Sequence, residues 1–319
     1  MKLFDRVYRV IFGHSSSAKE FNNLAEGSPA LQIKFSVSKE HAPEPNVTKL
    51  SIYNLSEESR AQCEESDTQV ELYAGYRPNG APSLVSSGSV VDAYSRRDPQ
   101  SGDIVTELEF YDGWKPLRDT VLSMSYKKGA SAHQLIKAVA SAMGCALSIA
   151  KGAPNYTWLS GFSYQGSAHG ALTKACAAAG LKWSIQNGKI QVTQLLNSTQ
   201  RQAAVINEGS GMIGSPERVY KSAEQMQKKP LEKGEKRPEN TTSILSTNPD
   251  KQRRRGWRVK TLLRPDISPG DLVVVESNTV TGTFMAEKVE HSGDFCDGDW
   301  ATTLELYEDT TGKYTYSKG

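Results

Sequence analysis

Alternation of apolar and polar residues marks the first third of the chain. The run LQIKFSV at residues 31–37 alternates without a break, which places one set of side chains on a core face and the other in water. Similar runs follow at residues 50–53 and 70–73, and further strands are predicted over residues 88–94 and 104–111. Short strands at this spacing predict a barrel or a sandwich.

Cap and turn residues separate these strands. Ser56 is followed by Glu57 and Glu58, a polar N-cap with carboxylates in the first turn, and this predicts a short helix. Asn79 and Gly80 lie in a turn over residues 76–82, where an Asn-Gly pair favours a hairpin.

The hydrophobic period changes from two to that of a helix in the middle of the chain. Ser131 can cap a helix, with Gln134 at the reciprocal position, and Gly144 ends it. A second helix runs from Ser167 to Gly180. The apolar positions of the first helix share one face: Leu135, Ile136, Val139, Ala140 and Met143.

A short strand follows each of the two helices, at residues 146–149 and 181–185. Asn187 and Gly188 then form a turn into a strand at residues 189–192. This helix–strand repeat predicts a small α+β unit.

The last third is polar at first and then returns to strands. Residues 221–252 have almost no apolar side chains and cannot bury enough apolar area to offset their ordering entropy, so we expect a mobile loop. Strands are predicted over four later runs: residues 257–263, 271–276, 283–291 and 302–307.

Composition limits the class of protein. The chain has 319 residues, a formal net charge of +2 and a mean hydropathy of -0.52, so two or three domains without membrane helices are expected. The apolar pieces near the N-terminus are too short for a signal peptide. We therefore expect synthesis in a cytoplasm and no membrane anchor.

Four cysteines lie far apart in the sequence and form no C-x-x-C pair: Cys63, Cys145, Cys176 and Cys296. Clustered thiolates or imidazoles, which zinc requires, are absent. A reducing compartment disfavours disulfides, and we interpret all four as buried or neutral thiols.

Histidine pairs are one candidate for chemistry. His133 and His169 stand at equivalent positions in the two repeat helices, so they are either two metal ligands or merely the helix-start residues of a duplicated motif. We favour the second interpretation. No G-x-S-x-G, H-E-x-x-H or P-loop motif occurs in the sequence.

Paired carboxylates are a second candidate, for acid–base work on a glycan. They occur at Glu57-Glu58, Glu64-Glu65 and between Asp294 and Asp299. Glycosidase carboxylates flank a sugar at separations of roughly 5–10 Å, whereas adjacent carboxylates on a helix or turn are usually solvated, and we favour the solvated interpretation.

A basic stretch over residues 251–260 is the third candidate. Arg253, Arg254 and Arg255 precede Trp257 and Arg258, which resembles a phosphate-binding patch with a stacking aromatic. A solvated loop and a protein contact are the alternatives, and the solvated loop is favoured. The glycines of residues 209–214 indicate a linker rather than a nucleotide-binding loop.

The order and spacing of four blocks carry a family resemblance. The first two are VTKLSIYNLS at residues 47–56 and VELYAGY at residues 70–76, and the third is the helix–strand repeat at residues 131–192. The fourth runs from residue 257 through ISPGDLVV at residues 267–274 and AEKVEHSGDF at residues 286–295 to Trp300. Together they resemble baseplate hub proteins of contractile phage tails, of the Mu type, and more remotely the hub part of type VI secretion spike proteins.

The resemblance implies an α+β, mainly β fold with two tube-protein-like β-barrels and the small helix–strand domain between them. The implied domains are residues 1–118, residues 119–196 and residues 197–319, the last containing the polar segment 221–252. It also implies a homotrimer whose six barrels form a ring joining the tail tube to the central spike.

The implied partners are the tail tube or distal tail protein, the spike and, as a further candidate, the tape measure protein. The resemblance also implies that DNA passes through the ring without specific binding and that the chain resides in the virion. No catalytic, cofactor-binding or metal residue and no cofactor is expected. Two alternatives remain, a tail-associated peptidoglycan hydrolase and a DNA-binding β-barrel protein that uses residues 251–260.

Overall fold

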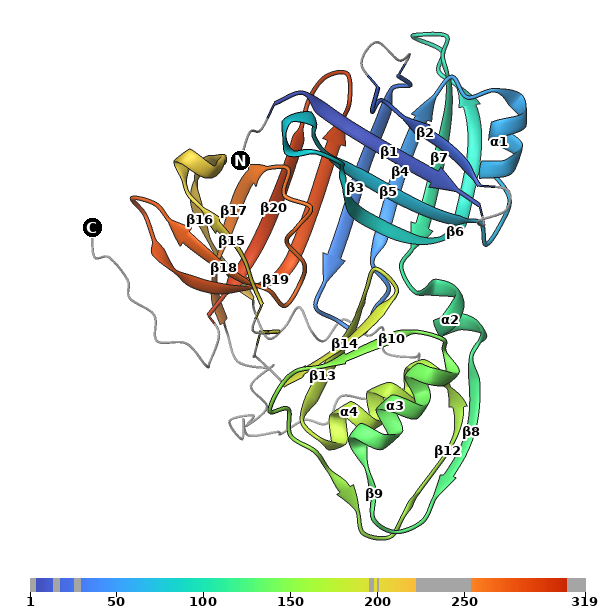
Figure 1. Ribbon diagram of the computed structural model, residues 1–319, viewed down its shortest axis with the longest axis vertical. Coiled ribbons are helices and arrows are strands. Elements are labelled where there is room, and N and C mark those ends of the chain that lie inside the picture. Colours follow the sequence, from blue (N-terminus) through green and yellow to red (C-terminus); the bar gives the residue numbers. More distant parts are fainter. Residues whose placement is uncertain are drawn as a thin grey trace, which may run out of the picture.

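The computed structural model describes residues 4–13, 18–25, 30–194, 198–199, 201–221 and 254–308. One large sheet forms the upper part of the molecule in Figure 1, and a smaller α+β unit hangs below it. The large sheet contains thirteen strands: β1 (Arg6–Phe12), β2 (Lys19–Asn22), β3 (Ile33–Glu40), β4 (Val47–Tyr53), β5 (Gln69–Tyr76), β6 (Ser83–Arg97), β7 (Ile104–Tyr111), β15 (Gln202–Ile206), β16 (Met212–Lys221), β17 (Arg254–Leu262), β18 (Leu272–Glu276), β19 (Thr281–Asp294) and β20 (Trp300–Tyr307).

The large sheet consists of two halves with the same strand order. The first half runs β1-β5-β6-β7-β4-β3 and the second runs β15-β18-β19-β20-β17-β16. In both halves the strands also follow one another along the chain in the same sequence. Pairing of β3 with β19 joins the halves into one sheet. The α+β, mainly β class predicted from the sequence is confirmed.

One long strand in each half bends and pairs with two successive neighbours. Strand β6 pairs with β5 through its first residues and with β7 from Ser89 onward, with a register shift at Val91. Strand β19 pairs in the same way with β18 and then with β20, with a register shift at Glu287. An extra residue bends a strand and increases its twist, so each half is strongly curved.

The described strands do not close into two separate barrels. The sheet ends at β2 on one side and at β16 on the other. Closure of the first half would need β3 to pair within its own half, but the outer side of β3 is taken by β19.

Apolar side chains fill each curved half. The first core contains Tyr8, Phe12, Phe110 and their neighbours, together with Leu263 and Trp300 from the second half. The second core is built around Phe284 and the valine-rich strand β18. The strictly alternating burial of β3 and β5 follows the alternation of their sequences.

The α+β unit has a core of its own, in which α3 (Ala132–Ala142) packs against α4 (Ala168–Ala178). Strands β10 (Ala146–Ile149), β14 (Lys189–Gln194) and β13 (Leu181–Gln186) form one sheet. Two ribbons complete the unit: β8 (Val121–Tyr126) with β12 (Phe162–Ser167), and β9 (Ala130–Ser131) with β11 (Thr157–Trp158).

Capping explains why the helices begin and end where the sequence predicts. The Ser131 and Ser167 hydroxyls accept hydrogen bonds from the backbone N–H groups of Gln134 (3.3 Å) and Gly170 (3.2 Å). Gly144 and Gly180 follow the helices with φ of 67° and 66°, which a glycine adopts at little cost. Both predicted helices are confirmed.

The other turn and cap predictions are confirmed too. Ser56 caps α1 (Glu57–Cys63) by accepting from the backbone of Ser59 at 3.3 Å. A 3₁₀ turn, η1 (Arg77–Asn79), and Gly80 at φ 91° connect β5 to β6. A further short helix, α2 (Trp114–Asp119), leads from the first half into the α+β unit.

Two segments contain strands that the sequence pattern did not predict. Strand β1 was not predicted, although it lies in the first core. Residues 202–221 form β15, the 3₁₀ turn η2 (Glu208–Ser210) and β16, so the glycines of residues 209–214, interpreted as a linker, lie in or next to η2 and β16. Most of the polar segment 221–252 lies outside the described residues.

Candidate assembly site

Pairing of β3 with β19 shows how one half docks on another. The register sets Lys288 opposite Glu40 and Gly293 opposite Phe35. The Lys288 ammonium lies 3.7 Å from the Glu40 carboxylate. A Cβ at Gly293 would lie 2.3 Å from the Phe35 ring, so only glycine allows the two strands to approach as they do.

Side chains add to this junction between the halves. The backbone N–H of Leu263 donates to the Tyr76 hydroxyl at 3.0 Å, and the Trp300 indole donates to the Gly75 carbonyl at 3.3 Å. Burial raises the pKa of Tyr76 to about 12, so this phenol stays neutral. The Arg6 guanidinium donates to the carbonyls of Asp294 (2.6 Å) and Gly298 (2.9 Å).

A buried polar cluster fixes the α+β unit to the first half. The Asp112 carboxylate, at the end of β7, accepts from the backbone N–H groups of Asn187 (2.5 Å) and Gly188 (2.7 Å) in the β13–β14 turn. The Asn46 amide donates to the Ile185 carbonyl at 2.7 Å and to the Gln186 side chain at 3.0 Å. The predicted Asn-Gly turn is therefore also the contact point between the two parts.

Lys39 is buried in the same cluster. Its ammonium donates to the Asn187 side chain at 3.0 Å. Burial lowers the pKa of Lys39 to about 8, and the Asp112 charge acts against this shift. Burial likewise raises the pKa of Asp112, while Lys39 and the Asn187 and Gly188 N–H groups oppose the shift. Since burial makes such charges costly, the cluster specifies orientation more than it adds stability.

An ion pair joins the second half to the α+β unit. The Lys182 ammonium lies 2.9 Å from the Glu287 carboxylate, and both side chains are largely buried. Glu287 is the extra residue at the bend of β19, so the bend directs this carboxylate toward the unit.

Besides the edge strands β2 and β15, two further backbone edges of the large sheet are unpaired among the described strands. Strand β16 pairs only with β17, and residues Val91–Arg97 of β6 have β7 on one side and no strand on the other. Strand β16 and strand β6 lie on opposite sides of the molecule (Figure 1). Large apolar side chains are exposed on both strands: Val91, Tyr94, Ile213 and Tyr220. Unpaired edges with exposed apolar residues are typical of sites for strand addition.

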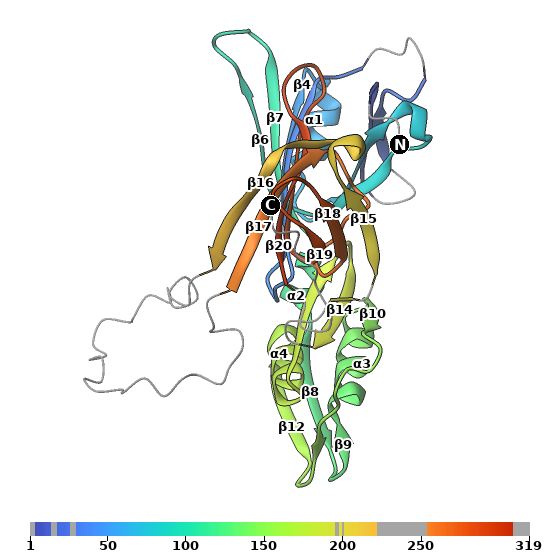
Figure 2. The same ribbon diagram turned by 90° about the vertical axis from the view of Figure 1, so that its left-hand side faces the viewer.

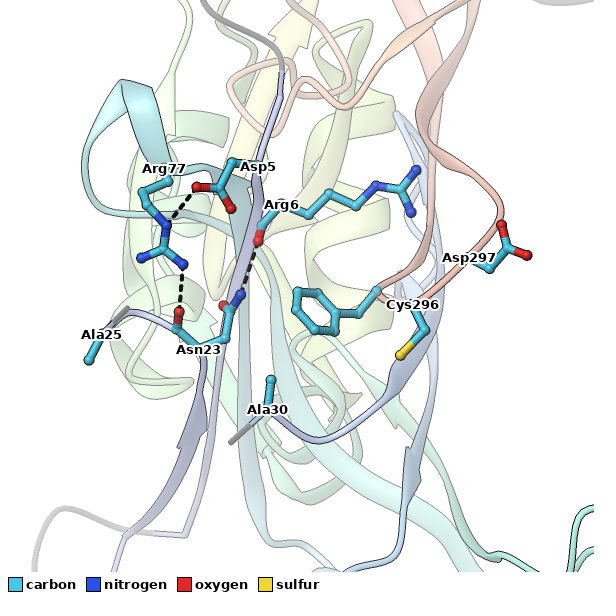
Figure 3. Close-up of a pocket in the computed structure, with 9 residues that line it drawn as sticks. Asp5, Arg6, Asn23, Ala25, Ala30, Arg77, Cys296 and Asp297 are labelled. Atoms are coloured by element: carbon cyan, nitrogen blue, oxygen red, sulfur yellow. Dashed lines mark hydrogen bonds and ion pairs between the residues drawn. The ribbon is translucent and has the colours of Figure 1, made fainter. Parts of the chain in front are cut away.

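A pocket of about 510 Å³ lies between the N-terminal strand and the β19–β20 loop. Figure 3 shows Arg77 turned toward Asp5 and Asn23, and Arg6 extended toward the loop that carries Asp297. Arg77 forms an ion pair with Asp5 at 2.8 Å and donates to the Asn23 carbonyl at 3.0 Å. Both guanidinium groups therefore hold loops in place.

The two candidate histidines have different environments. The His133 ring bonds to the Pro154 carbonyl at 3.0 Å, whereas the His169 ring packs edge-on against Trp183 at 5.2 Å. Within the described ranges no group of three or more His, Cys, Asp or Glu side chains is placed to hold a metal ion.

The candidate carboxylates lie in two places, Glu57, Glu58 and Glu64 on α1 and at its C-cap, and Asp294 at the end of β19. Glu57 and Glu58 are exposed in the first turn of α1, where Glu58 pairs with Lys19 at 2.9 Å. Glu64 accepts from the Ser95 hydroxyl. Asp294 accepts from backbone N–H groups in the β19–β20 loop and pairs with Lys34 at 3.2 Å.

The basic stretch is described only in part. Residues 251–253 lie outside the described residues, and Arg254 and Arg255 are described as backbone of β17 only. Arg258 pairs with Glu305 at 2.9 Å, and Trp257 is buried with Arg218 over its ring at 5.2 Å. A buried tryptophan offers no face for a stacked base.

All four cysteines are free thiols. Burial raises the pKa of Cys63 and of Cys176 to about 12, so these two are neutral, as the sequence predicted. Burial also raises the pKa of Cys145. Cys296 is exposed rather than buried.

The family resemblance implies two similar units, but the residues that mark them as a duplication were not recognised in the sequence. The signal is present in the last strand of each half: TELEFYD at residues 106–112 and TTLELYE at residues 302–308. The ion pairs on these strands are equivalent too, because Lys49 pairs with Glu109 at 3.6 Å and Arg258 with Glu305 at 2.9 Å.

Comparisons with known proteins agree on the fold. No protein-family model and no curated protein matches the chain. Among solved structures, the tail protein from Neisseria meningitidis MC58 superposes with a TM-score of 0.60 at 13% identity, covering 95% of this chain and 97% of that one. The 43 kDa tail protein of prophage MuSo2 from Shewanella oneidensis has a TM-score of 0.61 at 11% identity, covering 95% and 98%.

A third similar structure comes from a secretion system. It is an Escherichia coli type VI secretion component, described as structurally similar to the T4 bacteriophage tail proteins gp27 and gp5, with a TM-score of 0.52 at 9% identity. It covers 88% of this chain and 74% of its own. The chain described here thus has the fold shared by phage tail proteins and type VI secretion components.

Proposed function

We propose that this chain is a structural baseplate hub subunit of a phage-type tail, three copies of which form a ring between the tail tube and the central spike. One observation carries the proposal. The fold matches two tail proteins from end to end, over 97% and 98% of their lengths.

The duplicated sheet suits such a ring. One chain supplies two halves of the same strand order, so three chains supply six similar units around a three-fold axis. A ring of this kind matches a six-fold tube on one side and a three-fold spike on the other. It also covers the unpaired edges of β16 and β6, which would promote aggregation in isolation.

We propose the domain division 1–118, 119–196 and 197–319. Each range has a buried core of its own among the described residues. Leu263 and Trp300 enter the first core from the last range, which makes the two halves interdependent.

The proposed partners are the tail tube or distal tail protein, the spike and the tape measure protein, all within the virion. The α+β unit supports a partner-facing role, because residues 120–194 contain seven lysines and no aspartate or glutamate. A positively charged surface favours an acidic partner and repels a second copy of the same surface. Passage of DNA without specific binding, and synthesis in the host cytoplasm, belong to the same proposal.

A scaffolding role without catalysis fits the geometry better than hydrolysis. Glu58 engages a lysine, Glu64 a hydroxyl, and Asp294 backbone N–H groups and a lysine, whereas a glycosidase needs two carboxyl groups facing one cleft. In the part of the chain that the structure describes, no helix is long and apolar enough to cross a membrane.

The molar mass in solution tests the proposal. Light scattering should give about 105 kDa, three times the chain mass of 34.9 kDa. A chain that stays monomeric both alone and with the spike protein of the same tail would refute the ring. Cell-wall zymography tests the hydrolase alternative. Salt-dependent DNA affinity that is lost when Arg253, Arg254 and Arg255 become alanine would favour the DNA-binding alternative.

A further inference from the structure

From Ser89 and Met285 onward, strands β6 and β19 are equivalent residue by residue in the two halves. Ser89 and Val90 pair with Tyr111 and Phe110 just as Met285 and Ala286 pair with Tyr307 and Leu306. Both strands then have one extra residue, after which Asp92 and Lys288 resume the pairing opposite Glu109 and Glu305. Asp92, Tyr94 and Arg96 therefore correspond to Lys288, Glu290 and Ser292.

Only β19 has a neighbour on its other side after the bend. Residues Lys288–Asp294 pair with β3 of the first half. The corresponding residues Asp92–Arg97 have no strand on that side among the described residues. Strand β16 occupies in the second half the place that β3 has in the first, and no described strand pairs with its outer side.

We propose that β16 of one copy pairs antiparallel with Asp92–Arg97 of β6 in a second copy, repeating between chains the β3–β19 junction within each chain. The inference rests on the proposed ring and specifies its interface. Transfer of the internal register sets Tyr94 opposite Val219 and Arg96 opposite Glu217. By the same transfer, Asp92 stands opposite position 221, which is a lysine.

Charge complementarity supports this register. It brings Arg96 opposite Glu217, and opposite charges on directly facing residues stabilise antiparallel pairs. Lys288 and Glu40, which face each other at the β3–β19 junction, form such a pair inside the chain, at 3.7 Å. Arg96 already contacts Glu107 at 2.7 Å and is more than half exposed, so the guanidinium has room for a second carboxylate.

Side chains on the core face agree with the same pairing. Tyr220 is 47% exposed in the single chain, and the register places it opposite Ala93, which packs against the first core. Arg218 falls opposite Ser95, whose hydroxyl donates to Glu64. The pairing would bury an exposed aromatic ring and place an arginine near a carboxylate.

The contact uses different surfaces on the two copies, so it is heterologous. Heterologous contacts form a closed ring when the rotation at each step divides a full turn evenly, and an open filament otherwise. Strand β16 and the bend of β6 lie on opposite sides of the molecule (Figure 1), as a head-to-tail ring requires.

Cysteine cross-linking tests the register. The full chain is made with Tyr94→Cys and Val219→Cys, with the exposed Cys296 changed to serine, and is oxidised under conditions in which light scattering shows the assembled form. We expect covalent dimers and trimers on a non-reducing gel. The control pair, Tyr94→Cys with Glu217→Cys, is diagonal, at a Cα separation of roughly 7–8 Å that a disulfide does not span without backbone movement. It should cross-link at least tenfold more slowly.

Charge exchange gives an independent readout. Glu217→Arg alone should weaken trimer formation at least tenfold, because the new arginine would face Arg96. Adding Arg96→Glu should restore trimer formation. The register would be wrong if trimers formed but the facing cysteine pair did not cross-link, or if the diagonal pair cross-linked equally fast. Either result would leave the proposed function intact. A wild-type chain that does not trimerise, even with its spike protein, would overturn both.

Discussion

Asp112 provides the sharpest test of how the α+β unit is held. Its carboxylate is 1% exposed and accepts from two backbone N–H groups of the β13–β14 turn, at 2.5 and 2.7 Å. Asparagine has nearly the same shape but only one acceptor oxygen. In Asp112→Asn, therefore, the amide NH₂ group must face one of the two N–H donors.

The expected cost follows from these contacts. A hydrogen bond to a charged group contributes about 1.5–3 kcal/mol, and an unsatisfied buried N–H costs about 1–3 kcal/mol. Burial of the carboxylate is itself unfavourable, as the raised pKa of Asp112 indicates, and asparagine avoids that cost. We expect Asp112→Asn to lower the free energy of unfolding by about 2–3 kcal/mol.

The effect should be local to the junction. Urea unfolding gives the stability change, and amide hydrogen exchange should be faster over residues 181–192, because the turn loses its anchor. Asp119→Asn is the matched control, since Asp119 is exposed and pairs with the adjacent Arg118, and its cost should stay below about 0.5 kcal/mol. If the Asp112 and Asp119 variants unfold alike, the anchor interpretation is wrong.

Two further changes test the buried junctions. Gly293→Ala should lower the free energy of unfolding by about 1–3 kcal/mol, because its Cβ would meet the Phe35 ring at 2.3 Å. An equal urea midpoint for Gly293→Ala and for Ser292→Ala would contradict this. Lys39→Met tests linkage: the lowered pKa of Lys39, about 8, means that the unfolded state binds more protons between roughly pH 8 and 10.5. The free energy of unfolding of the wild type should therefore rise by about 3 kcal/mol relative to that of the variant as pH rises through that window. A difference that stays constant with pH would refute this linkage.

Local patterns in the sequence predicted the elements whose burial follows their own periodicity. Strand β3 is buried at every second residue because it lies between a core and solvent. The helix limits followed from Ser131 and Ser167, because a cap acts on its own first turn. Strand β16 could not be recognised in this way, since an edge strand with exposed side chains has no apolar face to display.

The assembly site depends on contacts between distant residues. Pairing of Lys288 with Glu40 joins residues far apart in the chain, and no local preference selects it. The sequences TELEFYD and TTLELYE are similar, but only the strand order of both halves shows that they belong to a duplication. The equivalence of β6 with β19 and of β16 with β3 then identifies the open edges.

The covalent fusion of the two halves has a consequence for assembly kinetics. Within one chain, β3 finds β19 as part of folding, at a local concentration set by the connecting polypeptide and independent of the amount of protein present. In the proposed ring every second junction is of this kind, so only half of the contacts must be made by diffusional encounter. Dilution would then separate whole chains while leaving each internal junction closed, which makes the paired half-units the smallest pieces from which such a ring is built.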